Sequence, residues 1–94
     1  MSQHMDALKL ANDIRLARAD IKRKLKSGEL DIKDVLNDPP PELENMTIYD
    51  LIFSLQRWGR ARTLRALRRS QISEWMTVGR MTPRIRNALL EDFS

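Results

Sequence analysis

Apolar residues recur at every third or fourth position along most of this chain, a spacing that places side chains on one face of an α-helix. The longest such stretch is residues 6–26, whose apolar face consists of Leu10, Ala11, Ile14, Ala17, Ile21 and Leu25. Gly28 ends the stretch, because glycine readily takes the left-handed conformation that closes many helices. A helix of this length is long for so small a protein, and we expect it to project beyond the core.

Shorter helices are predicted at residues 31–37, from Thr47 onward, at 60–69 and at 83–93. Three of them begin with a side chain that can accept a hydrogen bond from a free helical N–H group, namely Asp31, Thr47 and Thr82. Gly59 breaks the pattern before residue 60, and Pro83 suits the first position of the last helix. Residues 70–81 have no clear period and are expected to make one or two tight turns.

The apolar faces of these helices supply the candidate core. Their members are Ile32, Val35 and Leu36; Ile48, Leu51, Ile52 and Leu55; Ala61, Leu64 and Leu67; and Ile85, Ala88, Leu89 and Phe93. No strand-like alternation is sustained, and no segment repeats. The pattern therefore predicts an all-α fold, in which a long N-terminal helix joins a small helical core.

We expect residues 1–94 to form a single domain. N-terminal helices would occupy residues 6–38, an acidic, proline-rich connector residues 39–46, and a second helical module residues 47–94. Three successive prolines in the connector cannot continue a helix and favour extended backbone. Neither side of the connector is large enough to be a separate domain.

Composition leaves enzyme chemistry little support. The chain has no cysteine, and its one histidine, His4, lies near the N-terminus, where a lone histidine is usually inert. Asp31 and Asp34 would share a helix face, but helix capping explains them better than a metal site. No serine has a histidine partner, and no glycine-rich phosphate-binding motif is present. We therefore expect no catalytic residue, no metal and no cofactor.

The apolar runs are too short to span a membrane, and the N-terminus lacks the apolar core of a signal peptide. We accordingly expect a protein of the cytoplasm and nucleoid that makes no membrane contact. We also expect it to be a monomer in solution.

The net charge of +4 is distributed unevenly. Residues 57–86 hold nine arginines and one acid, residues 29–50 hold seven acids and one lysine, and residues 6–26 hold seven basic and three acidic groups. Every basic residue after position 47 is arginine, which makes the forked contacts with phosphate that lysine does not. A solvated basic face is the simplest interpretation, and a surface for a polyanion is the alternative.

The helix at 60–69 carries the densest basic face. Arg62, Arg65 and Arg69 lie at i, i+3 and i+7, with Arg60 and Arg68 beside them. Crowded like charges on a helix cost roughly 0.2–0.5 kcal/mol per pair, a cost that a bound polyanion would remove.

Gly59, flanked by Arg57, stands at the mouth of this helix. A glycine there would let a phosphate approach the free N–H groups, where the helix dipole favours an anion. An ordinary turn between helices would call for the same permissive glycine dihedrals, so both interpretations stay open.

Two further basic groups lie outside this helix. One surrounds the start of the last helix and would join the basic face if residues 70–81 fold back; it consists of Arg80, Arg84 and Arg86. The other shares one side of the first helix, at i, i+3 and i+7, and consists of Arg15, Arg18 and Lys22. Two basic faces suggest either one wide footprint or two duplexes contacted at once.

Each tryptophan allows two interpretations. Trp58, beside a helix junction, is of the kind that usually fills a gap in the core, whereas stacking on a base would require exposure. The same choice applies to Trp75. Met76 and Met81 are interpreted as gap-fillers.

The order of these features resembles the actinobacterial integration host factor family of small nucleoid-associated proteins. The resemblance covers residues 11–93 and rests on four stretches, "RLARADIKRKLKSGELDIKDVLND", "NMTIYDLIFSL", "RWGRART" and "RNALLEDF". It implies an all-helical core with a helix-two-turn-helix module. It also implies double-stranded DNA binding with weak sequence preference, through backbone and minor-groove contacts, with bending or compaction of the duplex in the nucleoid.

By matching position, the resemblance assigns the turn contact to Trp58, Gly59, Arg60 and Arg62. The chain departs from the family where a pair of adjacent arginines is usual in the second turn, because Met76 and Thr77 stand there and only Arg80 remains. Gln56 replaces a usual proline. The arginines at 65, 68 and 69 are then candidates to replace the missing contacts, in a divergent or phage-borne member of the family.

Three functions follow from this sequence. The leading hypothesis is non-catalytic, architectural binding of double-stranded DNA, in support of recombination or phage integration. The second is RNA binding on the ribosome, where the same helical module occurs. The third is a protein-interaction module for a recombinase or integrase.

Overall fold

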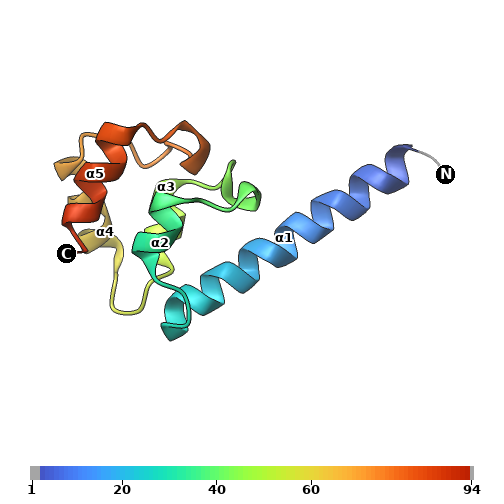
Figure 1. Cartoon of the computed structure of the whole chain (residues 1–94), viewed down its shortest axis with the longest axis horizontal. Helices are drawn as coiled ribbons and strands as arrows, with labels where there is room; N and C mark the ends of the chain where they lie inside the picture. Colours follow the sequence, from blue (N-terminus) through green and yellow to red (C-terminus); the bar gives the residue numbers. More distant parts are fainter. Residues whose placement is uncertain (1–2, 94) are drawn as a thin grey trace.

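A computed structural model describes residues 3–93 (Figure 1). The elements of this part of the chain are α1 (Gln3–Ser27), α2 (Ile32–Asn37), η1 (Pro41–Leu43), α3 (Ile48–Phe53), α4 (Arg60–Arg69), η2 (Val78–Arg80) and α5 (Pro83–Glu91), where η marks a 3-10 helix. Over residues 3–93 the sole β-type pairing is an isolated antiparallel bridge between Thr47 and Thr77. The all-α prediction is confirmed.

The N-terminal part of α1 extends away from the other helices as a rod (Figure 1). The molecule is therefore elongated, with extents of 48 × 26 × 22 Å. Leu25, near the C-terminal end of α1, is buried, Ile14, Ala17 and Ile21 are half-buried, and Leu10 is 61% exposed. The predicted apolar face of the first helix is thus covered only toward its C-terminal end. No helix within residues 3–93 has the length and apolar character needed to cross a membrane.

The core lies between the four shorter helices and η1. Its most completely buried apolar side chains are Leu36, Leu43, Ile48, Leu51, Ile52, Leu67 and Leu89. Three helix starts have the expected caps: Asp31, Thr47 and Thr82 accept hydrogen bonds from the backbone N–H groups of Lys33, Asp50 and Ile85, at 3.0, 3.1 and 3.2 Å. Each cap satisfies a donor that the helix itself leaves free.

The buried face of α4 differs from the predicted one. Ala61 is exposed and Leu64 only half-buried, while the buried residues are Thr63, Ala66 and Leu67. Thr63 can face the core because its hydroxyl donates to the carbonyl of Gly59 at 2.8 Å, so that no polar group is left unsatisfied. An apolar-residue count could not recognise this internally satisfied threonine.

The turn between α3 and α4 also departs from expectation. Gly59 has φ −87° and ψ −179°, ordinary extended backbone that any residue adopts, so its predicted need for permissive dihedrals is wrong. The left-handed residue of this turn is Arg57, with φ 71°. Leu55 lies beyond the end of α3 and is half-buried, rather than continuing the helical stripe.

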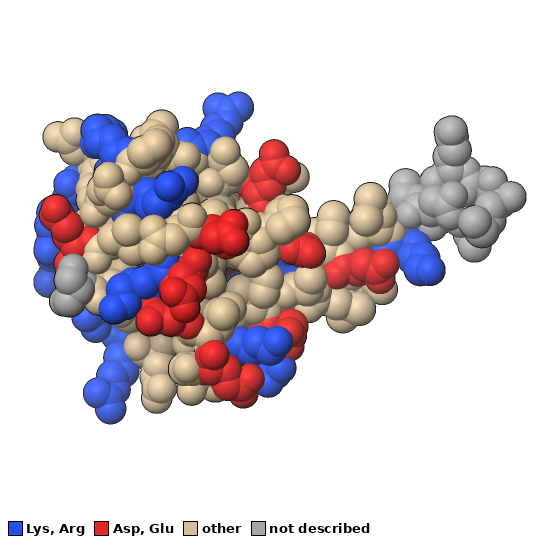
Figure 2. Space-filling model, viewed as in Figure 1, with Lys and Arg blue, Asp and Glu red and all other residues tan. Residues whose placement is uncertain are grey.

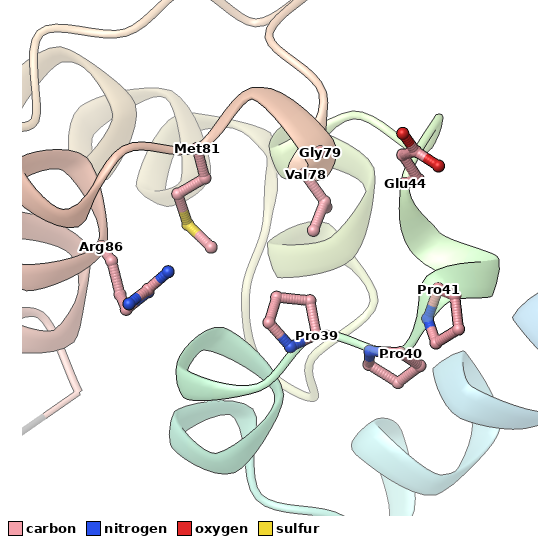
Figure 3. A pocket seen from close by; sticks show the side chains of 8 residues that line it. All are labelled: Pro39, Pro40, Pro41, Glu44, Val78, Gly79, Met81 and Arg86. Carbon is pink, nitrogen blue, oxygen red and sulfur yellow. The ribbon is translucent and has the colours of Figure 1, made fainter.

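The proline connector packs beside η2 (Figure 3). The backbone N–H groups of Val78 and Gly79 donate to the carbonyls of Met46 and Glu44, at 2.8 and 2.9 Å. A Cβ at Gly79 would lie 2.5 Å from Cγ and 2.9 Å from the carbonyl oxygen of Glu44. Glycine is therefore required here by close backbone approach, and it holds η2 against the connector.

Candidate nucleic-acid interface

The arginines of α4 line two hollows. Arg62, Arg65 and Arg69 share a hollow of about 340 Å³ with Trp58 and Asp92. Arg60 and Arg68 belong to another, of about 430 Å³. The face predicted from the spacing of residues 62, 65 and 69 is therefore present, and two of its neighbours turn to a different side.

Trp58 lines the first hollow together with Arg62. Its ring contacts Phe93 with centroids 5.1 Å apart, and the guanidinium carbon of Arg62 lies 4.0 Å from its centroid. Trp58 is half-buried and packs against the core. This geometry favours the gap-filling interpretation, and it orients the Arg62 guanidinium by a cation–π contact.

The remaining arginines of this hollow differ in their partners. Arg69 Nη1 lies 2.9 Å from Oδ1 of Asp92, whose side chain is only 8% exposed. Arg65 is exposed and has no ion pair within residues 3–93. Arg62 and Arg65 are thus more available to an anion than Arg69, whose charge balances a nearly buried carboxylate.

The first turn of α4 is open to solvent. Gly59 is exposed, has no side-chain cap, and a Cβ built on it would meet nothing within 4 Å. Arg57, one residue before Trp58, is also exposed. The positive end of the helix dipole therefore faces solvent, and the exposed residues Arg57 and Arg60 lie close to it in sequence.

The basic side of α1 faces the protein. Arg15, Arg18 and Lys22 line one hollow of about 440 Å³, as their spacing predicted. However, Nε of Arg18 donates to the carbonyl of Glu42 at 2.7 Å, and Nζ of Lys22 lies 3.1 Å from Oδ2 of Asp50. Arg18 and Lys22 therefore hold α1 against the acidic residues 29–50, and Arg15 is the exposed residue of the three.

Two further cations of α1 are paired locally. Arg23 and Lys24 lie 2.6 and 3.0 Å from the carboxylate of Asp20. The hydrogen bond from Arg23, followed by that from Lys24, lowers the pKa of Asp20. This part of α1 is consequently less basic than its composition indicates.

Three arginines follow α4 in different settings. Arg80 on η2 and Arg84 in the first turn of α5 are exposed. Arg86 instead turns toward the proline connector, where it lines a hollow of about 320 Å³ (Figure 3). Its Nε is buried and has no hydrogen-bond partner among the described residues. Arg86 is thus less suited to a solvent-facing contact than the other two.

On the face drawn in Figure 2, basic side chains surround the end of the molecule that holds α4 and α5, and acidic side chains gather toward its middle. Acidic side chains also occur at that end and basic ones among the acidic group, so the charge separation predicted along the sequence is only partial in space. The part of the chain that the structure describes contains no cluster of side chains suited to holding a metal ion.

The sequence pattern left two features of this part of the molecule undecided or unseen. Trp75 is 76% exposed, the largest fraction among the exposed large hydrophobic side chains. Arg57 adopts left-handed backbone, whereas the sequence pattern assigned the unusual dihedrals of this turn to Gly59, two positions later. Neither feature produces a periodic pattern in the sequence. Whether Trp75 fills a gap in the core or is free to stack on a base could be decided only from its exposure in the fold.

Comparison with known proteins gives one informative result. No family model and no curated protein matches the chain. Among solved structures, that of sIHF, the Streptomyces integration host factor, bound to an 8-bp palindromic DNA matches with a TM-score of 0.83. The match covers 92% of this chain and 99% of sIHF. The chain has the sIHF fold.

Sequence identity to sIHF is 24%. At that level the similarity establishes the arrangement of helices, and it agrees with the fold that the family resemblance implied. Roles of individual residues have to be argued from this chain's own geometry.

Proposed function

We propose that this chain binds double-stranded DNA without catalysing a reaction, as a nucleoid-associated architectural protein and a divergent or phage-borne member of the integration host factor family. Affinity comes mainly from arginine–phosphate contacts, and sequence preference is weak. The fold supports this proposal, since the solved structure of sIHF, which has the same fold, contains DNA.

The observation that carries the proposal is the open, unpaired basic surface at the start of α4. Arg57, Arg62 and Arg65 are exposed and have no ion pair among the side chains of residues 8–93, and the exposed Gly59 starts α4 without a side-chain cap. A phosphate at this helix end would accept backbone hydrogen bonds and lie among guanidinium groups. Within the described fold, Arg62 makes a cation–π contact with Trp58 but no ion pair, so its guanidinium N–H groups stay available to a phosphate.

The proposed contact residues fall into three groups by their structural setting. The primary contacts are Arg57, Gly59, Arg60, Arg62 and Arg65. Trp58 and Arg69 hold that surface in shape, through the Arg62 stack and the Asp92 ion pair. The outer contacts are Arg15, Arg80 and Arg84. Arg18 and Lys22 are engaged by Glu42 and Asp50, and would contact DNA only where it lies along the rim of the hollow that they line.

Arg80 is the remaining candidate for the minor groove. It follows Gly79, whose close approach to Glu44 fixes the backbone of η2. A guanidinium at a fixed turn can enter a narrow, electronegative minor groove and respond to groove width rather than to base identity.

Charge reversal tests this proposal with a matched control. The double variant Arg62→Glu, Arg65→Glu should weaken binding to unrelated duplexes alike, because both contacts are to phosphate. The control Lys9→Glu, Lys33→Glu makes the same change in net charge at two exposed lysines away from α4 and should bind nearly as the wild type. Equal losses in the two variants would show a general charge effect and contradict an α4 interface, and a loss confined to one duplex sequence would indicate base readout.

A further inference from the structure

Trp75 belongs to a surface that shares only Arg60 with the duplex contacts proposed above. It shares its hollow of about 430 Å³ with Arg60, Arg68 and Ser73. Trp75 is 76% exposed, although a tryptophan gains more than most residues from burial. The stability of the fold therefore does not depend on the exposed part of this ring.

The backbone around Trp75 is held on both sides. Before it, Ile72 is buried and its N–H group donates to the carbonyl of Leu67 at 3.0 Å. After it, the carbonyl of Met76 accepts a hydrogen bond from Ile48 N–H at 2.8 Å. The Trp75 N–H group itself donates to Oγ of Ser73 at 3.3 Å. The indole is thus displayed from a fixed backbone, which lowers the entropy that a ligand would have to remove.

A chain of contacts leads from this hollow to a second exposed aromatic ring. Glu74, next to Trp75, has Oε2 3.9 Å from Nη2 of Arg60. The guanidinium carbon of Arg60 lies 5.9 Å from the Tyr49 ring centroid, and Tyr49 stacks on Phe53 with centroids 5.6 Å apart and planes 13° apart. Phe53 is 45% exposed. We call Phe53, Tyr49, Arg60, Arg68 and Trp75 the aromatic–arginine belt.

We propose that the aromatic–arginine belt binds an unpaired strand of DNA, with a base stacked on Trp75 and phosphates at Arg60 and Arg68. Every base has an aromatic face, but in a duplex both faces are covered by neighbouring base pairs. The belt therefore takes nucleotides only where pairing is lost, at an overhang, a frayed end or an extruded base. Its combination of flat rings and cations matches a ligand that is both flat and anionic.

This inference rests on the proposed function only in placing the strand beside a bound duplex. Arg60 belongs to both surfaces, so a strand leaving a duplex on the α4 face could continue onto the belt. The protein should therefore bind a duplex with a single-stranded overhang more tightly than a blunt duplex with the same number of base pairs.

The test compares the full-length chain and its Trp75 variants on labelled blunt and overhang duplexes by fluorescence anisotropy. Trp75→Ala should weaken binding to the overhang duplex by about 5- to 150-fold and leave the blunt duplex unchanged, because stacking is lost only where a base is free. Trp75→Phe keeps a ring and should retain most of the preference, while Trp75→Leu keeps apolar bulk and should lose it. Leu16→Ala, which removes an exposed apolar side chain outside the belt, is the control.

Fluorescence separates this proposal from the proposed function. In a Trp58→Phe background, oligothymidylate should quench the emission of Trp75, even if no duplex binds. The belt proposal is overturned if wild type has no overhang preference, if Trp75→Ala weakens both duplexes equally, or if Trp75→Leu binds as well as Trp75→Phe. That last result would identify an apolar surface for a protein instead.

Discussion

Gly79→Ala should destabilise this protein, although the glycine is exposed and lies in a short 3-10 turn. The added Cβ would lie 2.9 Å from the carbonyl oxygen of Glu44 and 2.5 Å from its Cγ. Cγ can move with its side chain, but the carbonyl cannot move without weakening the 2.9 Å hydrogen bond that it accepts from Gly79 N–H. Forced overpacking of this kind costs about 1–3 kcal/mol.

For a domain of this size, 1 kcal/mol corresponds to a Tm change of about 4–8 °C. We therefore expect differential scanning calorimetry to show Gly79→Ala melting roughly 4–24 °C below wild type. Gly59→Ala is the matched control. At Gly59 a Cβ has open space and φ is −87°, so the lower conformational entropy of the unfolded alanine variant offsets its poorer helix cap. Its Tm should stay within roughly 4 °C of wild type.

The reasoning would be refuted if Gly79→Ala and Gly59→Ala melted at the same temperature. Such a result would mean that the Glu44 segment moves aside freely and that η2 is not held against the connector. The position of Arg80 would then also be unconstrained.

Three further stability changes can be measured by urea denaturation. Arg69→Met should lower the free energy of unfolding by about 1–3 kcal/mol, because it leaves the nearly buried Asp92 carboxylate without its partner. Adding Asp92→Asn should recover much of this loss, and no recovery would contradict a stabilising ion pair. Lys22→Met should cost less than about 1 kcal/mol, since the Lys22–Asp50 pair is 37% and 45% exposed. Gln71→Gly should gain about 0.5 kcal/mol at its left-handed φ of 59°, whereas Gln56→Gly, outside the left-handed region, should lose a similar amount; equal signs would exclude backbone strain as the cause.

Local signals predicted much of the fold. Asp31, Thr47 and Thr82 cap helices as their positions indicated, because a cap depends on side chains within three residues. The bounds of α4 also agree with the sequence pattern, and the long first helix projects as its length suggested.

Features that depend on distant partners or on satisfied polar groups were not predictable in the same way. Arg18 and Lys22 share a face, but their partners lie 24 and 28 residues away, and only the folded chain brings them together. Thr63 enters the core because a carbonyl four residues earlier accepts its hydroxyl proton. Residue spacing alone could separate neither anchors from free cations nor an exposed Trp75 from a buried one.

The central claim is that exposed arginines around α4 bind the DNA backbone with little regard to sequence. It is tested most directly by measuring affinity for two unrelated duplexes over a range of salt concentrations. If about five phosphates are neutralised, the logarithm of the binding constant should fall with the logarithm of salt with a slope of about −4.5. Both duplexes should give nearly the same slope. Binding that is insensitive to salt, or no binding at low salt, would contradict the account.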